Sequence, residues 1–303
     1  EAHNNLGVTI QELGQLDKAV KCYEQALAIK PDYAEAHNNL GNAFKELGQL
    51  DDAVKSYKKA LAIKPDFSDA HYNLAVTLQG LGQLDKAVKC YEQVLAIKPD
   101  FAEAFNNLGI VLKELGQLDT AVKSYEQVLA IKPDFAEAHN NLGITLQELG
   151  QLDAAVKSYE KALAIKPDYA EASNNLGFIL QELGQLDKAV KCYKQALSIK
   201  PDNASTHNNL GVIFRDLDQI DNATKQFEKA LTIKPDFAGA YYNLGFINQD
   251  LGKVDDAIKQ FEKAISIKKN YAEAHHNLSY LKKFTENDSQ ITLMQSLLNT
   301  GNL

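Results

Sequence analysis

Residues 34–67 read AEAHNNLGNAFKELGQLDDAVKSYKKALAIKPDF, and closely similar stretches follow one another along the 303-residue chain without insertion. A first copy that lacks one residue precedes this stretch, and the last copy is half complete. A fixed period of this length indicates one supersecondary unit that is repeated along the chain. The copies begin 34 residues apart, at Ala34, Ser68, Ala102, Ala136, Ala170, Ala204, Ala238 and Ala272.

Glycine and proline residues at fixed places in each copy predict two helices. The first helix begins near Ala34 and ends at Gly48, because glycine suits the left-handed residue that closes a helix. Asp218 takes the place of this glycine once. The second helix ends near Lys64, before Pro65, which cannot continue it. Asp51 is expected to cap the start of the second helix. The spacing of Asp32 and Glu35 is typical of a capping box for the first.

Apolar residues fall at helical spacing on both helices of the unit. A single helical hairpin cannot bury both apolar faces, whereas stacked neighbours can. The sequence therefore predicts an all-α solenoid in which each unit contacts only the next. In the copy at Ala34 the stripes are Leu40, Phe44 and Leu47 on the first helix, and Ala53, Tyr57, Ala60 and Leu61 on the second.

The recurring Asn-Leu-Gly, the alanines, the aromatic residue and the proline resemble the tetratricopeptide repeat (TPR) over roughly residues 1–284. The resemblance implies a right-handed superhelical solenoid of 34-residue helix-turn-helix units, starting near residues 1, 34, 68, 102, 136, 170, 204, 238 and 272. Histidine departs from the family's large aromatic residue at His3, His37, His71, His139, His207 and His275.

One asparagine holds the same place in every unit. In TPR superhelices the first helices line a concave surface. The TPR arms of O-linked N-acetylglucosamine transferases, which this chain resembles, hold extended peptides there through an asparagine ladder. The resemblance thus implies a protein-binding scaffold without catalytic residues of its own. Its rungs would be Asn5, Asn39, Asn73, Asn107, Asn141, Asn175, Asn209 and Asn243.

Two further columns share the face of this ladder. A second asparagine directly precedes the first in many units. An apolar residue lies four residues after this second asparagine, on the same side of the helix. The second asparagines include Asn38, Asn106, Asn140 and Asn174, and the apolar residues include Ile110, Ile144 and Phe178. An alternative interpretation is purely structural: the asparagines bond to neighbouring helices and the apolar residues support stacking.

Charge is distributed by helix. Acidic residues such as Glu35 and Glu46 lie on the first helices, and one lysine, Lys55 in the copy at Ala34, recurs on the second. A groove lined by the first helices would favour basic or neutral segments. It would not suit the C-terminal carboxylates of chaperones, which need Lys and Arg there. A net charge of -8 with a single arginine also argues against nucleic-acid binding.

No constellation for chemistry is evident. The cysteines Cys22, Cys90 and Cys192 occupy one place in separate units and alternate with serine elsewhere, so neither a disulfide nor a nucleophile is expected. No metal-binding or cofactor-binding motif is present. No stretch has the roughly 18 apolar residues of a membrane helix. We expect a cytoplasmic protein that is not an enzyme and needs no cofactor or metal.

The period stops near residue 284. Asp288 or Ser289 could cap a short helix with an apolar stripe at Ile291, Met294, Leu297 and Leu298, and this helix would cover the last solenoid interface. Residues 285–303 are thus either a capping helix or the start of a linker. They also resemble the junction between TPR repeats and a sulfotransferase domain in bacterial proteins. An alternative function is therefore a substrate-recruiting arm of a larger transferase, of the sulfotransferase or the glycosyltransferase type.

Overall fold

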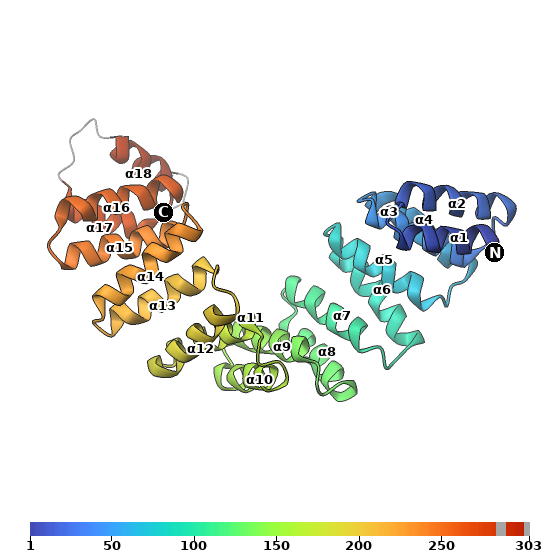
Figure 1. Cartoon of the computed structure of the whole chain (residues 1–303), viewed down its shortest axis with the longest axis horizontal. Coiled ribbons are helices and arrows are strands. Elements are labelled where there is room, and N and C mark those ends of the chain that lie inside the picture. The colour runs from blue at the N-terminus through green and yellow to red at the C-terminus, as the bar shows by residue number, and fades with distance from the viewer. Residues whose placement is uncertain (283–288, 300–303) are drawn as a thin grey trace. The chain divides into compact units, whose positions relative to one another are not determined.

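The computed structural model describes residues 1–282 and 289–299, and every element in those ranges is an α-helix (Figure 1). The first helix of each copy spans ten to thirteen residues. These first helices are α1 (Ala2–Glu12), α3 (Ala34–Glu46), α5 (Ser68–Gly80), α7 (Ala102–Glu114), α9 (Ala136–Glu148), α11 (Ala170–Glu182), α13 (Ala204–Asp216), α15 (Ala238–Asp250) and α17 (Ala272–Leu281).

The second helix of each copy packs antiparallel to the first. These are α2 (Leu16–Ile29), α4 (Leu50–Ile63), α6 (Leu84–Ile97), α8 (Leu118–Ile131), α10 (Leu152–Ile165), α12 (Leu186–Ile199), α14 (Ile220–Ile233) and α16 (Val254–Ile267). The chain divides into two compact units, residues 1–165 and 166–303. Within each, a hairpin stacks on the next. The predicted all-α solenoid of helix pairs is confirmed.

The turn inside each repeat explains why one predicted cap is wrong. Gly48 adopts φ +75°, its N–H donates to Lys45 O at 3.0 Å, and the N–H of Gln49 donates to Phe44 O at 2.8 Å. This closure already places Gln49 at the start of α4, which begins at Leu50. Asp51 therefore lies inside the first turn and makes no side-chain cap bond, although its charge still favours the helix dipole. The left-handed residue was predicted correctly, including Asp218 at φ 58°.

The capping box predicted for the first helices is also wrong. The residue that caps α3 is Tyr33, which forms no side-chain cap bond, because the chain turns one residue later than Asp32. Instead, Lys30 lies over the Tyr33 ring, with Nζ 5.1 Å from the ring centroid. The same lysine-over-ring contact recurs at most of the later junctions, for example between Lys64 and Phe67.

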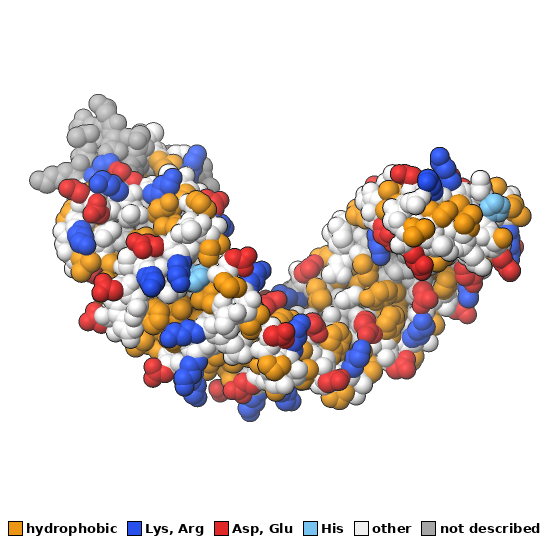
Figure 2. Space-filling model, in the orientation of Figure 1, with side chains coloured by type: hydrophobic (Ala, Val, Ile, Leu, Met, Phe, Trp, Pro, Cys, Tyr) orange, Lys and Arg blue, Asp and Glu red, His pale blue; other side chains and the backbone are white. Residues whose placement is uncertain are grey.

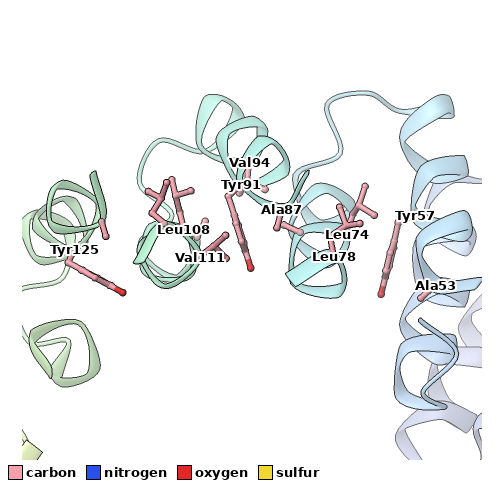
Figure 3. Close-up of a cluster of buried hydrophobic side chains, with 14 residues drawn as sticks. Ala53, Tyr57, Leu74, Leu78, Ala87, Tyr91, Val94, Leu108, Val111 and Tyr125 are labelled. Atoms are coloured by element: carbon pink, nitrogen blue, oxygen red, sulfur yellow. The ribbon is translucent and has the colours of Figure 1, made fainter. Parts of the chain in front are cut away.

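The core of a repeat lies between its two helices. In the copy at Ala34, Ala53, Tyr57 and Ala60 are fully buried. A Cβ added to Gly41 would lie 2.5 Å from Tyr57 Cε1, because the ring lies directly against the backbone of the first helix at this glycine. Figure 3 shows the rings of Tyr57, Tyr91 and Tyr125 between successive helices of the first compact unit, packed against leucine and alanine side chains.

Histidine has a structural role that the sequence did not reveal. His37 Nε2 lies 3.0 Å from Pro31 O, in the loop that enters its repeat. The bond recurs at His71, His139, His207 and His275, at 2.8 to 3.1 Å. Where Ser173 replaces the histidine, Gln195 Nε2 donates to Pro167 O at 3.0 Å. In these six copies the loop carbonyl therefore accepts a hydrogen bond from a side-chain nitrogen.

The C-terminal helix α18 (Ser289–Asn299) contributes Leu293 to the cluster formed by Phe261, Ile265 and Leu278. The contact agrees with a capping role, but the boundary near residue 284 stays a prediction. The proposed cap at Asp288 and Ser289, and the side chain of Leu298, lie outside the described residues.

Candidate peptide-binding face

The recurring asparagine joins successive repeats. Its side-chain Nδ2 donates to the residue at the second asparagine place of the preceding repeat, which is 35 residues earlier. The bonds with an asparagine acceptor are Asn39 to Asn4 (3.1 Å), Asn73 to Asn38 (3.1 Å), Asn141 to Asn106 (3.2 Å) and Asn243 to Asn208 (3.0 Å). We call this row of bonds the amide seam. It shows that the two asparagine columns act as a donor and an acceptor, as the structural interpretation required.

Tyrosine replaces the acceptor asparagine twice and conserves the seam. Asn107 donates to Tyr72 OH at 2.9 Å, and Asn277 donates to Tyr242 OH at 3.3 Å. Each tyrosine also belongs to a three-ring cluster, one in each compact unit. Tyr72 contacts Tyr91 and Phe101, and Tyr242 contacts Phe261 and Tyr271. From the sequence these tyrosines are interruptions of the second asparagine column where partner choice could be encoded, because hydrogen-bond equivalence between Asn and Tyr is visible only in three dimensions.

Burial differs between the predicted columns. The acceptor asparagines Asn38, Asn106 and Asn140 are buried, whereas most of the donor column is half-buried. In the apolar column Ile110 and Ile144 are half-buried, and Phe178 is 39% exposed. The side chains that a ligand can reach therefore come mainly from the donor column and the apolar column.

A tyrosine hydroxyl reaches this face from the second helix. It donates to a glutamine of the first helix in four repeats, as Tyr23 to Gln11, Tyr91 to Gln79, Tyr159 to Gln147 and Tyr193 to Gln181, at 2.8 to 3.2 Å. Burial, followed by the charge of Glu46, raises the pKa of Tyr23 to about 12, so its hydroxyl stays a neutral donor.

Two of the copies that lack this bond between tyrosine and glutamine do so for different reasons. Tyr57 faces Lys45 instead of glutamine, and its hydroxyl donates to Asn42 Oδ1 at 2.8 Å. This explains why a polar residue stands in the apolar column at Asn42. In the copy at Ala238, Phe261 has no hydroxyl, and the buried Gln249 Oε1 lacks a hydrogen-bond partner within the described residues.

A cavity of about 330 Å³ opens on this face between α1 and α3. Val8, Gln11 and Glu12 line it from α1, and Asn39, Asn42 and Glu46 line it from α3. Gln11 Nε2 donates to Glu46 Oε1 at 2.7 Å, which orients the carboxylate at its edge. The cavity thus combines an amide, an apolar side chain and two carboxylates. We call the donor and apolar columns, with these acids, the first-helix face.

Metal clusters, disulfides and membrane helices do not occur in the described part of the chain. Within residues 1–282 and 289–299, no group of three or more His, Cys, Asp or Glu side chains could hold a metal ion. Cys22, Cys90 and Cys192 lie in separate repeats and form no disulfide. Among the described helices, none combines the length and apolar character needed to cross a membrane.

Family models match the chain almost continuously from residue 11 to residue 271. The model described as TPR repeat matches residues 11–48, 41–82, 80–116 and 111–150. Models described as Tetratricopeptide repeat match residues 134–202, 168–236 and 238–271. No curated protein sequence shows significant similarity to the chain.

Solved structures share the fold. A crystal structure of MamA is 28% identical, with a TM-score of 0.52, and the match covers 55% of this chain and 96% of MamA. PilF of Pseudomonas aeruginosa is 21% identical, with a TM-score of 0.60 and coverage of 68% and 94%. YrrB, described as a TPR protein with an unusual peptide-binding site, is 23% identical, with a TM-score of 0.52 and coverage of 62% and 96%. Repeat by repeat, in sequence and in fold, the chain belongs to the tetratricopeptide-repeat family.

Proposed function

We propose that the first-helix face binds protein or peptide segments and that the chain acts as a non-catalytic scaffold. The observation that carries this proposal is the cavity between α1 and α3, where an amide, an apolar side chain and two carboxylates converge. Such a mixture suits a peptide better than a small metabolite, because it offers hydrogen bonds to a backbone and a pocket for a side chain.

The seam bonds determine which atom of each asparagine is available to a ligand. In Asn39, Asn73 and Asn141 the Nδ2 group already donates along the chain, so a ligand N–H is best received by the Oδ1 atom. The bound segment would therefore donate its backbone N–H groups to the rungs and place side chains against Ile110 and Ile144. Glu12 and Glu46 favour a basic side chain at the cavity.

The test uses peptides selected by display against the folded protein. Their affinity is then measured for Ile110→Ser/Ile144→Ser, which alters only the half-buried apolar column of the first compact unit. We expect a loss of about tenfold, since each side chain contributes roughly 1 kcal/mol or less when it is partly exposed. A control variant, Lys157→Ala/Lys191→Ala, changes the second helices and should bind normally.

The asparagine rungs need a pair of variants, because Asn141 Nδ2 also forms the seam bond to Asn106. Asn141→Asp and Asn141→Ala both remove that donor, but only Asn141→Asp keeps Oδ1 as an acceptor, so peptide affinity should fall more in Asn141→Ala. Unchanged peptide affinity in Ile110→Ser/Ile144→Ser, together with equal affinities of Asn141→Asp and Asn141→Ala and normal circular dichroism, contradicts the proposal. The recruiting-arm alternative uses the same face. A catalytic domain in the complete reading frame would decide for it.

A further inference from the structure

A second and larger cavity lies on another surface of the molecule. It has a volume of about 680 Å³ and is enclosed by α12, α13 and α14 of the second compact unit. Leu197, Leu210, Phe214 and Ile233 supply an apolar floor, and its rim carries lysines. A volume of this size is within the usual range of ligand pockets, roughly 300 to 1,000 Å³.

This cavity does not share a surface with the first-helix face. On α13, His207, Leu210 and Phe214 line it, whereas Asn209 and Val212 belong to the columns of the first-helix face. Successive residues of a helix are rotated by about 100°. The two sets therefore point to nearly opposite sides of α13, and a ligand in the cavity contacts the second helices instead.

The rim of the cavity is basic. Lys194, Lys225 and Lys229 line it, and no Asp or Glu does. None of the three lysines forms a salt bridge in the part of the chain that the structure describes. The acids of α14, Asp221 and Glu228, line a different cavity, beside α15, which Lys225 also lines. In a chain of net charge -8 this is a local reversal of charge.

One substitution relative to most other repeats contributes to this basic rim. The place of Lys194 holds glutamate in six other copies, namely Glu24, Glu92, Glu126, Glu160, Glu228 and Glu262, and lysine in the copy at Ala34, as Lys58. Lysine stands at the place of Lys225 in every copy. Asn222 lines the cavity beside it without a charge, and its Nδ2 donates to Gln219 Oε1.

The same place two repeats earlier provides an internal reference. The cavity lined by Leu129, Pro133, His139, Lys161 and Ile165 has a volume of about 320 Å³. At the places of Lys194, Asn222 and Gln226 this copy has Glu126, Ala154 and Ser158. A cavity thus occurs at this position in two copies, but the one between α12 and α14 is larger and is lined by three lysines instead of one.

We propose that the cavity between α12 and α14 binds an acidic segment of a partner protein, which inserts one aliphatic or aromatic side chain. The apolar floor receives this side chain. The ammonium groups of Lys194, Lys225 and Lys229 face Asp or Glu residues that flank this side chain in the bound segment. Opposite charges favour binding here, whereas the net negative charge of the chain disfavours an acidic segment elsewhere. Lys194 is already held near the wall, with Nζ 5.9 Å from the Phe214 ring centroid.

The test measures fluorescence polarisation of labelled synthetic peptides with the whole chain. The probe is an acidic peptide with a central Phe-Leu pair, for example Asp-Glu-Glu-Phe-Leu-Asp-Glu-Glu. One control peptide replaces Phe-Leu by Ser-Ser, and a second replaces the acids by lysine. The protein variants are Lys225→Glu/Lys229→Glu and its matched control Lys157→Glu/Lys161→Glu at the α8–α10 cavity. Lys194→Glu restores the residue that six other copies carry, so this variant is expected to fold.

The acidic Phe-Leu peptide should bind the unaltered chain and weaken as salt rises from about 50 to about 500 mM. Its affinity should fall about tenfold or more in Lys225→Glu/Lys229→Glu, fall severalfold in Lys194→Glu, and change less than about threefold in the matched control. No binding, equal losses in the two double variants, or equal binding of the Ser-Ser peptide would overturn the proposal. The first-helix face is unaltered in all these proteins, so peptides selected for that face serve as a folding control.

Discussion

The interior of a repeat and the amide seam between repeats are built on different principles. In the interior, a ring from the second helix lies against the first helix, and a glycine Cα provides the space for it. In the seam, an asparagine amide donates to whichever acceptor the previous repeat supplies, Asn or Tyr. The interior therefore requires side chains of a particular size and shape, whereas the seam requires only a side chain that can accept a hydrogen bond.

The copy at Ser68 shows how far each principle tolerates change. It carries Ala75 at the place of the interior glycine, and Ala75 is fully buried in the cluster of Tyr91. It also carries Tyr72 at the acceptor place. One repeat has thus changed in both regions. The ring stays fully buried beside an alanine there, and the seam bond is kept. Substitutions in each region should therefore differ in their cost.

The largest effect is expected in the interior. Gly41→Ala would place a Cβ 2.5 Å from Cε1 of the fully buried Tyr57 ring, which has no room to move. We expect a loss of about 1–3 kcal/mol in the free energy of unfolding. Gly80→Ala is the control, because nothing lies within 4 Å of its added Cβ, and it should be neutral or slightly stabilising. Urea unfolding followed by circular dichroism measures both, and equal midpoints would disprove the shape argument.

A somewhat smaller effect is expected in the seam. Asn141→Ala leaves Oδ1 of the buried Asn106 without its donor, at a cost of about 1–2 kcal/mol. Asn106→Ala/Asn141→Ala removes both partners and should cost less than the sum of the single changes. A double-mutant cycle in urea tests this coupling. Additive losses would show that the seam bond contributes nothing of its own.

A gain in stability is expected in the copy at Ala238, where the interior ring lacks the hydroxyl that bonds to a glutamine of the first helix in other copies. Phe261→Tyr would give the buried Gln249 Oε1 the donor that Tyr193 gives Gln181, and stabilise the chain by about 1 kcal/mol. The matched control is Phe227→Tyr, which faces Arg215 rather than glutamine and should not be stabilising. Thermal unfolding measures both proteins, and a stabilised control would contradict the pairing.

The smallest effect is a dependence on pH. Burial lowers the pKa of His37 and His139 below the ordinary value, so the folded chain prefers both rings neutral. Their contribution is complete above about pH 6.5, where the unfolded chain is neutral too, and it is lost as the pH falls below that value. Stability should decline from pH 7 to pH 5. His37→Gln/His139→Gln, which retains a donor for the loop carbonyl, should show a shallower decline.

The sequence predicted the helix pairs well because period, glycine and proline act locally. The position of Asp51 was misjudged, since the closure at Gly48 moves the helix start by a residue that spacing alone does not reveal. The bonds of His37 to a loop carbonyl and of Asn107 to Tyr72 join residues whose contact depends on the fold. The asparagine columns were found by their regularity, but regularity does not distinguish a bond along the chain from a bond to a ligand.

The seam bond joins residues 35 positions apart, while the copies begin 34 residues apart. Each repeat therefore has one edge that donates and one that accepts, and the two edges match in any copy. Removing one whole copy would bring a donor edge against an equivalent acceptor edge, so the remaining bonds could all form. A change of any other length would misalign them. The length of such a chain can thus change in steps of one repeat, whereas insertions within a repeat are penalised.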